Sequence, residues 1–135
     1  MSRRRAAARS LVVVTCALLT TACGGTQDTE VSRTATGLLS AVGDGDGAAA
    51  CALLAPAVRT ELEDTSGKPC DRAVLDQPMG DGSGPVAVEV FDTAAQAVVG
   101  SETLFLSRFD GRWLVIAAAC RPVPDAPYDC GVGLP

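Results

Sequence analysis

The chain has 135 residues, enough for one domain, and its 16 acidic and 11 basic residues give a net charge of −5. This acidic balance excludes nucleic acid as a partner, because nucleic-acid binding depends on neutralising phosphates with Lys and Arg. The chain also contains no histidine, which excludes the Ser-His and Cys-His pairs on which many hydrolases depend.

The first 22 residues are predicted to be a secretory signal peptide. Four arginines precede the apolar run LVVVTCALL and the small residues TTA, which is the order of the charged, apolar and cleavage regions of such signals. The apolar run is much shorter than the about 20 residues of a membrane-spanning helix. Loss of the four arginines leaves seven basic against 16 acidic residues, a net charge of −9. We therefore expect the mature domain outside the cytoplasm.

The segment TTAC resembles the lipobox of bacterial lipoproteins, in which the cysteine, here Cys23, is lipidated and becomes the new N-terminus. Thr20 stands where that pattern usually has Leu, and an ordinary signal peptidase could also cut after Ala22. The cysteine count favours lipidation, because cleavage leaves five cysteines and an odd one needs explanation in an exported protein. The expected organisation is a signal peptide (1–22), a lipidated tether (23–29) and an α+β domain (30–135), held by its acyl anchor on the extracytoplasmic face of the cell membrane.

The first half of the mature chain is predicted to be helical. Apolar residues at positions 31, 35, 38, 39 and 42 recur at helical spacing, with Asp28 or Thr29 as the N-cap. A second short helix follows over residues 48–54, capped by Asp46, and Pro56 begins a third that ends near residue 64. One more helical turn is expected in CDRAVLDQ.

The segment GDGDG, which separates the first two helices, resembles a calcium-binding loop. An EF-hand loop beginning at Asp44 would need Gly at its sixth place and Glu at its twelfth. Those places hold Ala49 and Ala55. We therefore interpret the segment as a turn followed by the cap of the second helix.

From Gly80 onward the apolar residues alternate, which is typical of strands. Strands are expected in the segments GPVAVEVF, AAQAVVG, TLFLSRF and WLVIAAAC, with a type I′ hairpin turn at Asp110-Gly111. Helices followed by an antiparallel meander predict an α+β fold with the helices packed on one face of the sheet. The expected large core residues are Trp113, Phe91, Phe105 and Phe109.

Four cysteines remain for pairing within the domain: Cys51, Cys70, Cys120 and Cys130. Their spacing does not match a zinc site and the chain has no histidine, so we expect no metal or other cofactor. In an oxidising compartment they are expected to form two disulfides. Three connectivities are possible, and we favour the sequential one, Cys51–Cys70 and Cys120–Cys130. The second bond would close a proline-stiffened loop that folds the tail back on the last strand.

Catalytic chemistry has few candidates. The carboxylates of ELED (residues 61–64) belong on a solvated helix face, and Asp110 belongs to its turn. Glu89 and Glu102 lie near strands, and Asp125, Tyr128 and Asp129 lie in the tail. A carboxylate and a tyrosine facing one cavity could transfer a proton. The sequence does not show that these side chains converge, so we do not expect an enzyme.

The segment GRWLVIAAACRPVPDAPYDCGVG resembles the C-terminus of a family of small actinobacterial lipoproteins, with a Trp-initiated strand, a paired-cysteine tail and Pro-Tyr between the two cysteines. The segment from Cys51 to Cys70 (CALLAP, ELE, C) is similar to the same family, so the resemblance covers most of the chain after the tether. The family more often has Gly at the position of Ala119. The resemblance implies an NTF2-like (cystatin-like) fold, in which helices and a curved antiparallel sheet form a cone, and it implies the same disulfide pairing.

These observations favour a non-catalytic binding or accessory module. NTF2-like cones often hold an apolar pocket, so a small apolar ligand or a lipid is one expected partner, with Tyr128 and Asp129 at the mouth of the pocket. The first alternative is a protein-interaction module of a membrane complex in the cell envelope. The second is an enzyme of the NTF2-like type that uses Asp and Tyr.

Overall fold

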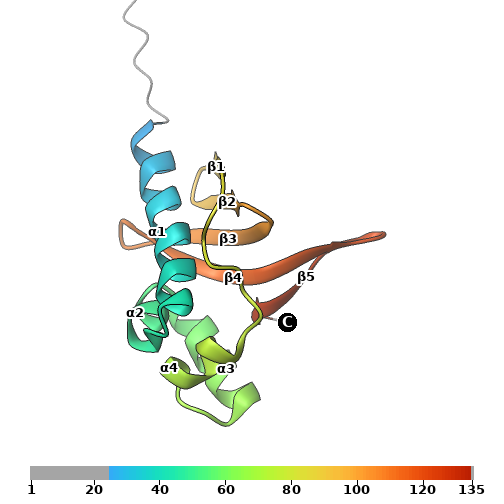
Figure 1. Ribbon diagram of the computed structural model, residues 1–135. Coiled ribbons are helices and arrows are strands. Elements are labelled where there is room, and N and C mark those ends of the chain that lie inside the picture. Colours follow the sequence, from blue (N-terminus) through green and yellow to red (C-terminus); the bar gives the residue numbers. More distant parts are fainter. Residues whose placement is uncertain (1–24, 135) are drawn as a thin grey trace, which may run out of the picture.

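A computed structural model describes residues 25–134 (Figure 1). The predicted signal peptide and the lipidation site Cys23 lie outside the described residues. Residues 25–29, which we expected in the tether, are helical instead, so the predicted cap at Asp28 or Thr29 is wrong. The Thr29 hydroxyl donates to the Gly25 carbonyl oxygen at 2.7 Å. Asp28 lies in the first turn, where a negative charge is stabilised by the helix dipole.

Helices precede strands throughout the described part of the chain. The helical elements are α1 (Gly25–Gly43), α2 (Gly47–Ala52), α3 (Pro56–Ser66), α4 (Cys70–Ala73) and the short 3-10 helix η1 (Val74–Asp76). The strands are β1 (Val86–Phe91), β2 (Ala94–Val99), β3 (Glu102–Phe109), β4 (Arg112–Val123) and β5 (Ala126–Gly133). Between residues 25 and 134 no helix has the length and apolar character needed to cross a membrane.

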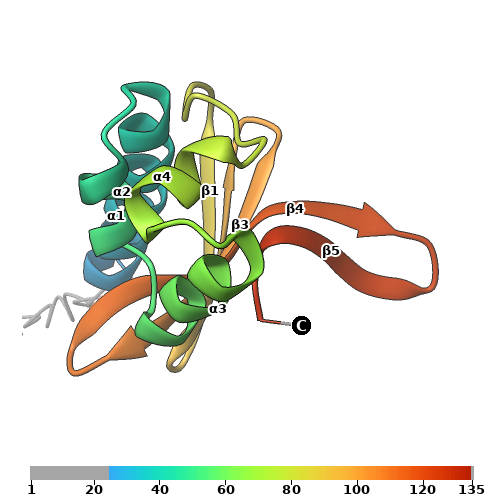
Figure 2. The ribbon, with the colours of Figure 1, turned by 90° about the horizontal axis from the view of Figure 1, so that it is seen from below.

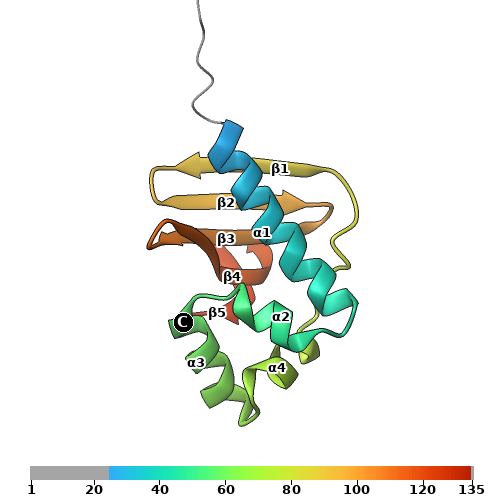
Figure 3. The same cartoon turned by 90° about the vertical axis from the view of Figure 1, so that its left-hand side faces the viewer.

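The strands form one antiparallel sheet in the order β1-β2-β3-β4-β5, which confirms the predicted α+β class. Helix α1 crosses one face of the sheet diagonally (Figure 3), and we call this the inner face. The turn between β3 and β4 is the predicted one: Asp110 and Gly111 both have positive φ, 48° and 81°, as a type I′ turn requires.

The helices are positioned by local signals that the sequence displays. The Asp46 side chain accepts a hydrogen bond from the Ala49 backbone N–H at 3.0 Å, which confirms it as the cap of α2. Pro56 begins α3 as predicted. Gly47 lies so close to α4 that a Cβ there would be 1.7 Å from the carbonyl oxygen of Asp71, so only glycine permits this approach of α2 to α4.

The core lies between α1, the smaller helices and the inner face of the sheet. Its largest side chains with under 2 % exposure include Leu38, Leu39, Leu54, Leu104 and Leu106.

Trp113 belongs to the core as predicted, with 4 % exposure. The prediction for Phe91 and Phe109 is wrong, because they are 62 % and 39 % exposed. Phe105 is half-buried and is not part of the core. Val90 packs against the core, and successive residues of a strand point to opposite faces, so Phe91 points away from the helices.

Beyond Cys120 and Cys130, β4 and β5 leave the sheet together as a hairpin that projects from the domain (Figures 1 and 2). We call residues 120–130 the arm. We had expected a disulfide-closed loop here, but the strands continue to Val123 and resume at Ala126. The described pairing of β4 with β3 ends at Cys120, and strands with a free edge tolerate proline.

Ala119, immediately before the arm, has a φ of 53°. This is the left-handed region that favours glycine and costs other residues about 1–2 kcal/mol. Ala119 lies where the register between β3 and β4 shifts, between Ala117 and Cys120. The backbone at Ala119 therefore favours glycine.

Candidate functional site

Both disulfides favoured by the sequence are present. Cys51 on α2 is bonded to Cys70 at the start of α4, with 19 residues of separation and a Cα–Cα distance of 6.1 Å. Both residues are buried. The Glu63 side chain accepts a hydrogen bond from the Cys70 backbone N–H at 3.0 Å, so this bond and α3 hold the smaller helices together.

The second disulfide, Cys120–Cys130, lies at the base of the arm. The two cysteines occupy directly opposite positions on β4 and β5. The bond therefore fastens the arm where it leaves the sheet. The tail folds back on β4 as expected, but as a paired strand and not as a loop. The role of this bond is therefore structural.

Tyr128 and Asp129, the predicted pocket mouth, lie in the arm. The Tyr128 ring packs edge-on against Phe105 of β3, with 5.1 Å between ring centroids. Asp129 is exposed and lies opposite Arg121 in the strand pair. As neighbours in a strand, Tyr128 and Asp129 point to opposite sides, so they do not face one reacting group.

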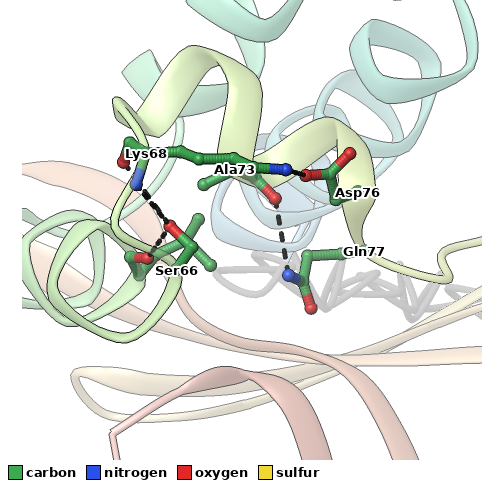
Figure 4. Close-up of polar contacts among 6 residues, drawn as sticks. Ser66, Lys68, Ala73, Asp76 and Gln77 are labelled. Carbon is green, nitrogen blue, oxygen red and sulfur yellow. Dashed lines mark hydrogen bonds and ion pairs between the residues drawn. The ribbon is translucent and has the colours of Figure 1, made fainter.

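One cavity of about 260 Å³ lies between α3 and β5. It is lined by Glu61, Leu62, Thr65, Ser66, Gln77 and residues 130–134. The Gln77 amide donates to the Ala73 carbonyl oxygen at 3.4 Å, as Figure 4 shows. The volume of this cavity is below the about 300–1,000 Å³ of usual ligand pockets, and the cavity lining is as polar as it is apolar.

The segment from α3 to η1 beside this cavity is held by short-range polar contacts. The Ser66 hydroxyl donates to the Leu62 carbonyl oxygen at 2.6 Å, and it accepts from the Lys68 backbone N–H at 3.2 Å. The Lys68 ammonium pairs with the Asp76 carboxylate (Figure 4). Both side chains are more than half exposed, so the pair adds little stability.

Two further hollows flank the first half of α1 where it passes over β1, with volumes of about 470 and 360 Å³. Val88 and Asp28 line both of them. Asp92 and Arg108 bring charges to the larger one. Both hollows are open and rimmed by polar groups, unlike the enclosed apolar pocket expected of a cone.

The chemistry available at these sites is limited. Among residues 25–134 there is no group of three or more His, Cys, Asp or Glu side chains that could hold a metal ion. The pKa of Asp81 is below its ordinary value because the side chain and the backbone N–H of Ser83 donate hydrogen bonds to the carboxylate. Asp81 is fully exposed in the loop before β1, so this shift does not indicate a reaction centre.

The sheet face opposite α1, which we call the outer face, is the distinctive surface. In Figure 2, α1 and α2 lie on one side of β1, and the arm projects on the other side. Strand register assigns these residues to it: Ala87, Glu89, Phe91, Ala94, Gln96, Val98, Thr103, Phe105, Ser107, Phe109, Arg112 and Leu114. Thr103 and Leu114 are buried, at 8 % exposure each, and the others are exposed or half-buried. Arg112, at the start of β4, also lines a hollow with Glu30 and Arg33 of α1.

The outer face carries all three phenylalanines of the chain, and Tyr128 of the arm packs against one of them. Sequence reasoning missed this surface because it assigned large aromatic residues to the core by type. The signal was present in the alternation: Phe91 is out of phase with Val86, Val88 and Val90.

Comparison of the chain with protein-family models, with curated proteins and with solved structures finds no significant match. The likeness to actinobacterial lipoproteins and to the NTF2-like fold therefore stays a prediction from the sequence, beside a confirmed α+β architecture.

Proposed function

We propose that this protein is an exported, lipid-anchored and non-catalytic module that binds protein through the outer face of its sheet. The observation that carries the proposal is the uncovered face itself. Monomeric soluble proteins rarely leave large contiguous apolar patches exposed, and such patches mark interaction sites. Aromatic residues are also enriched where proteins bind each other. Phe91 and Phe109, at 62 % and 39 % exposure, are therefore better explained as contact residues than as packing.

The packing of the interior favours a protein-binding role over the binding of a small ligand. Leu54, Leu104 and Leu106 fill the space between helices and sheet with no exposure, whereas a binding cone would keep that space open. The described cavities are open to solvent and have mixed lining. The divergence of Tyr128 and Asp129 in one strand, together with the absence of histidine, supports a non-catalytic role.

The proposed location rests on the N-terminal sequence. The basic leader, the short apolar run and TTAC fit a lipoprotein signal. Because α1 already begins at Gly25, a lipid on Cys23 would hold the domain within a few residues of the bilayer. The net charge of −9 after processing does not favour adsorption to anionic lipids, so the acyl group would be the membrane contact.

Two measurements test the proposal. Intact mass of the membrane-extracted protein should show a diacylglycerol increment on a chain that begins at Cys23, and an unmodified form in the medium would contradict the anchor. A photo-crosslinking amino acid at Gln96, in the middle of the outer face, should capture protein in cells. The matched control is the same group at Asp64, which is exposed on α3. Equal capture from both positions, or none from Gln96, would contradict the interaction face.

A further inference from the structure

We propose that the hollow between α1 and the β3–β4 turn binds a phosphate group, at a site separate from the outer face on which the proposed function depends. The hollow has a volume of about 210 Å³. Glu30, Arg33 and Thr34 of α1 line one side of it, and Arg112 and Trp113 of β4 line another. The twist of the sheet carries the β3–β4 turn to the side on which α1 lies (Figure 1), and this brings Arg112 beside the helix.

Trp113 gives the hollow a buried hydrogen-bond donor that has no acceptor. The residue is 4 % exposed, and its indole nitrogen Nε1 has no hydrogen-bond partner among the described residues. Buried polar groups nearly always have a partner, and an unpaired one costs free energy. The Thr34 hydroxyl donates to the Trp113 carbonyl oxygen at 3.4 Å, which joins the two sides of the hollow but leaves the indole N–H unpaired. An acceptor oxygen held in the hollow would complete the hydrogen bonding of Trp113.

Two arginines meet at this hollow in a strongly acidic chain. Residues 25–134 carry 16 acidic and seven basic side chains, and Arg33 and Arg112 are two of the seven. Both are exposed. The one ion pair within the described residues is Lys68–Asp76, so neither guanidinium is neutralised by a direct partner there. A guanidinium presents a planar fork of N–H donors that matches phosphate and carboxylate. The hollow therefore offers two such forks and the indole N–H to a bound anion.

Glu30 favours phosphate over a carboxylate as that anion. An ionised carboxylate only accepts hydrogen bonds, so Glu30 would repel a carboxylate ligand and could make no hydrogen bond with it. Hydrogen phosphate, or a phosphate monoester that keeps one proton, has an O–H that can donate to Glu30 while its other oxygens accept from the two arginines and Trp113. Phosphate monoesters lose this proton near pH 6. The hollow is smaller than the about 300–1,000 Å³ of usual ligand pockets, so it suits a phosphate group more than a larger ligand.

The same chemistry can come from two sources, free phosphate and the headgroup of a membrane lipid. Arg33 lies eight residues after Gly25, about 12 Å along α1. A lipid on Cys23, as proposed above, would therefore bring the hollow close to the bilayer surface. The headgroup of phosphatidic acid is a phosphate monoester, whereas that of phosphatidylglycerol is a diester and has no proton to donate to Glu30.

Trp113 is the one tryptophan of the chain, so its indole N–H is a direct readout of binding. The full protein, labelled with ¹⁵N-tryptophan and held in a neutral detergent, is titrated with inorganic phosphate at about pH 6 and at constant ionic strength. We expect a saturable shift of the single indole signal, with half-saturation below about 10 mM. Sulfate and acetate should bind at least about ten-fold more weakly, because neither has a proton to donate to Glu30. Equal binding of sulfate or acetate would overturn the assignment to phosphate.

A second arm of the experiment separates the two sources. The same protein is reconstituted in phosphatidylcholine vesicles, and the fluorescence of Trp113 is measured as phosphatidic acid or phosphatidylglycerol is included. A response to inorganic phosphate, with or without one to phosphatidic acid, assigns the site to free phosphate. A response to phosphatidic acid alone assigns it to a lipid headgroup. Equal responses to the two lipids, or no response in either arm, would overturn the site and would leave the outer face, which is tested by crosslinking from Gln96, unaffected.

Substitutions test which residues hold the anion. Arg33→Gln and Arg112→Gln should each weaken phosphate binding about ten-fold or more, because each removes a charge-assisted hydrogen bond. Arg72→Gln, the matched change at an exposed position on α4, should alter it by less than about two-fold. Glu30→Gln removes the repulsion of sulfate and should bring sulfate within about three-fold of phosphate. Equal losses in R33Q and R72Q, or an unchanged preference over sulfate in E30Q, would overturn the assignment, and an indole signal at its native position shows that each variant is folded.

Discussion

The Cys51–Cys70 disulfide offers the sharpest test of what stabilises the fold. Replacing both cysteines with alanine removes a bond that closes 19 residues. In the chain-entropy treatment, releasing a loop of this length stabilises the unfolded state by about 3 kcal/mol. Both cysteines are also buried, at 8 % and 7 % exposure, so the small void left by the sulfurs adds about 1 kcal/mol. The total of about 4 kcal/mol is a large part of the about 5–15 kcal/mol that stabilises a typical domain.

Urea unfolding followed by fluorescence measures this loss, because Trp113 is the one tryptophan in the chain and is buried at 4 % exposure. The matched control is C120A/C130A. That bond closes ten residues, so its contribution from chain entropy is slightly smaller than that of Cys51–Cys70. Its loss also frees the projecting arm in the folded state. We therefore expect a smaller loss in C120A/C130A. A loss below about 1 kcal/mol in C51A/C70A, or a larger loss in the control, would refute the reasoning.

Three further changes have expected outcomes. Ala119→Gly relieves the φ of 53° and should stabilise the protein by about 0.5–1.5 kcal/mol in urea unfolding; a loss of stability would contradict the strained backbone. Gly47→Ala places a Cβ 1.7 Å from the Asp71 carbonyl oxygen and should lower the free energy of unfolding by about 2 kcal/mol or more. The control Gly25→Ala, which has open space around it, should cause no measurable loss in the same assay. Phe91→Ala on the outer face should change the free energy of unfolding by less than about 1 kcal/mol, and Leu106→Ala in the core should cost about 3 kcal/mol; similar costs for the two would place Phe91 in the core after all.

Local sequence patterns were sufficient to predict the class of fold and the type of most secondary-structure elements. The spacing of Val31, Ala35, Leu38 and Leu39 predicted α1, and these four residues are buried. The Asp-Gly pair predicted the β3–β4 turn because few residues adopt positive φ readily. These signals are local in origin: helix periodicity, capping and turn conformation depend on residues within a few positions of each other.

The predictions from the sequence were wrong where contacts between distant segments determine the structure. The tail from Cys120 to Cys130 contains three prolines and was expected to be a loop. It forms paired strands because each strand of the arm has the other as its partner, and proline is tolerated on the free edge. Helix α1 begins inside the expected tether, where Gly25 and Thr26 carry no strong start signal.

The residues of the candidate site also divide into those that local sequence could predict and those that only the structure explains. The two disulfide pairs could be favoured from cysteine spacing, because spacing limits which bonds are compact. Tyr128 and Asp129 could not be assigned a role, since only the structure shows that Tyr128 packs against Phe105. The outer face became visible only after register linked Phe91, Phe105 and Phe109 across three strands.

The sequence by itself determined the α+β class, the cap of α2 and the β3–β4 turn, and it favoured the two disulfides, because each depends on residue type and short-range spacing. Only the tertiary structure decided which side of the sheet the helices cover. That choice depends on how α1 packs against β1, β2 and β4, which lie more than 40 residues farther along the chain. Covering one face left Phe91 and Phe109 on the other, and this is the surface on which the proposed function depends.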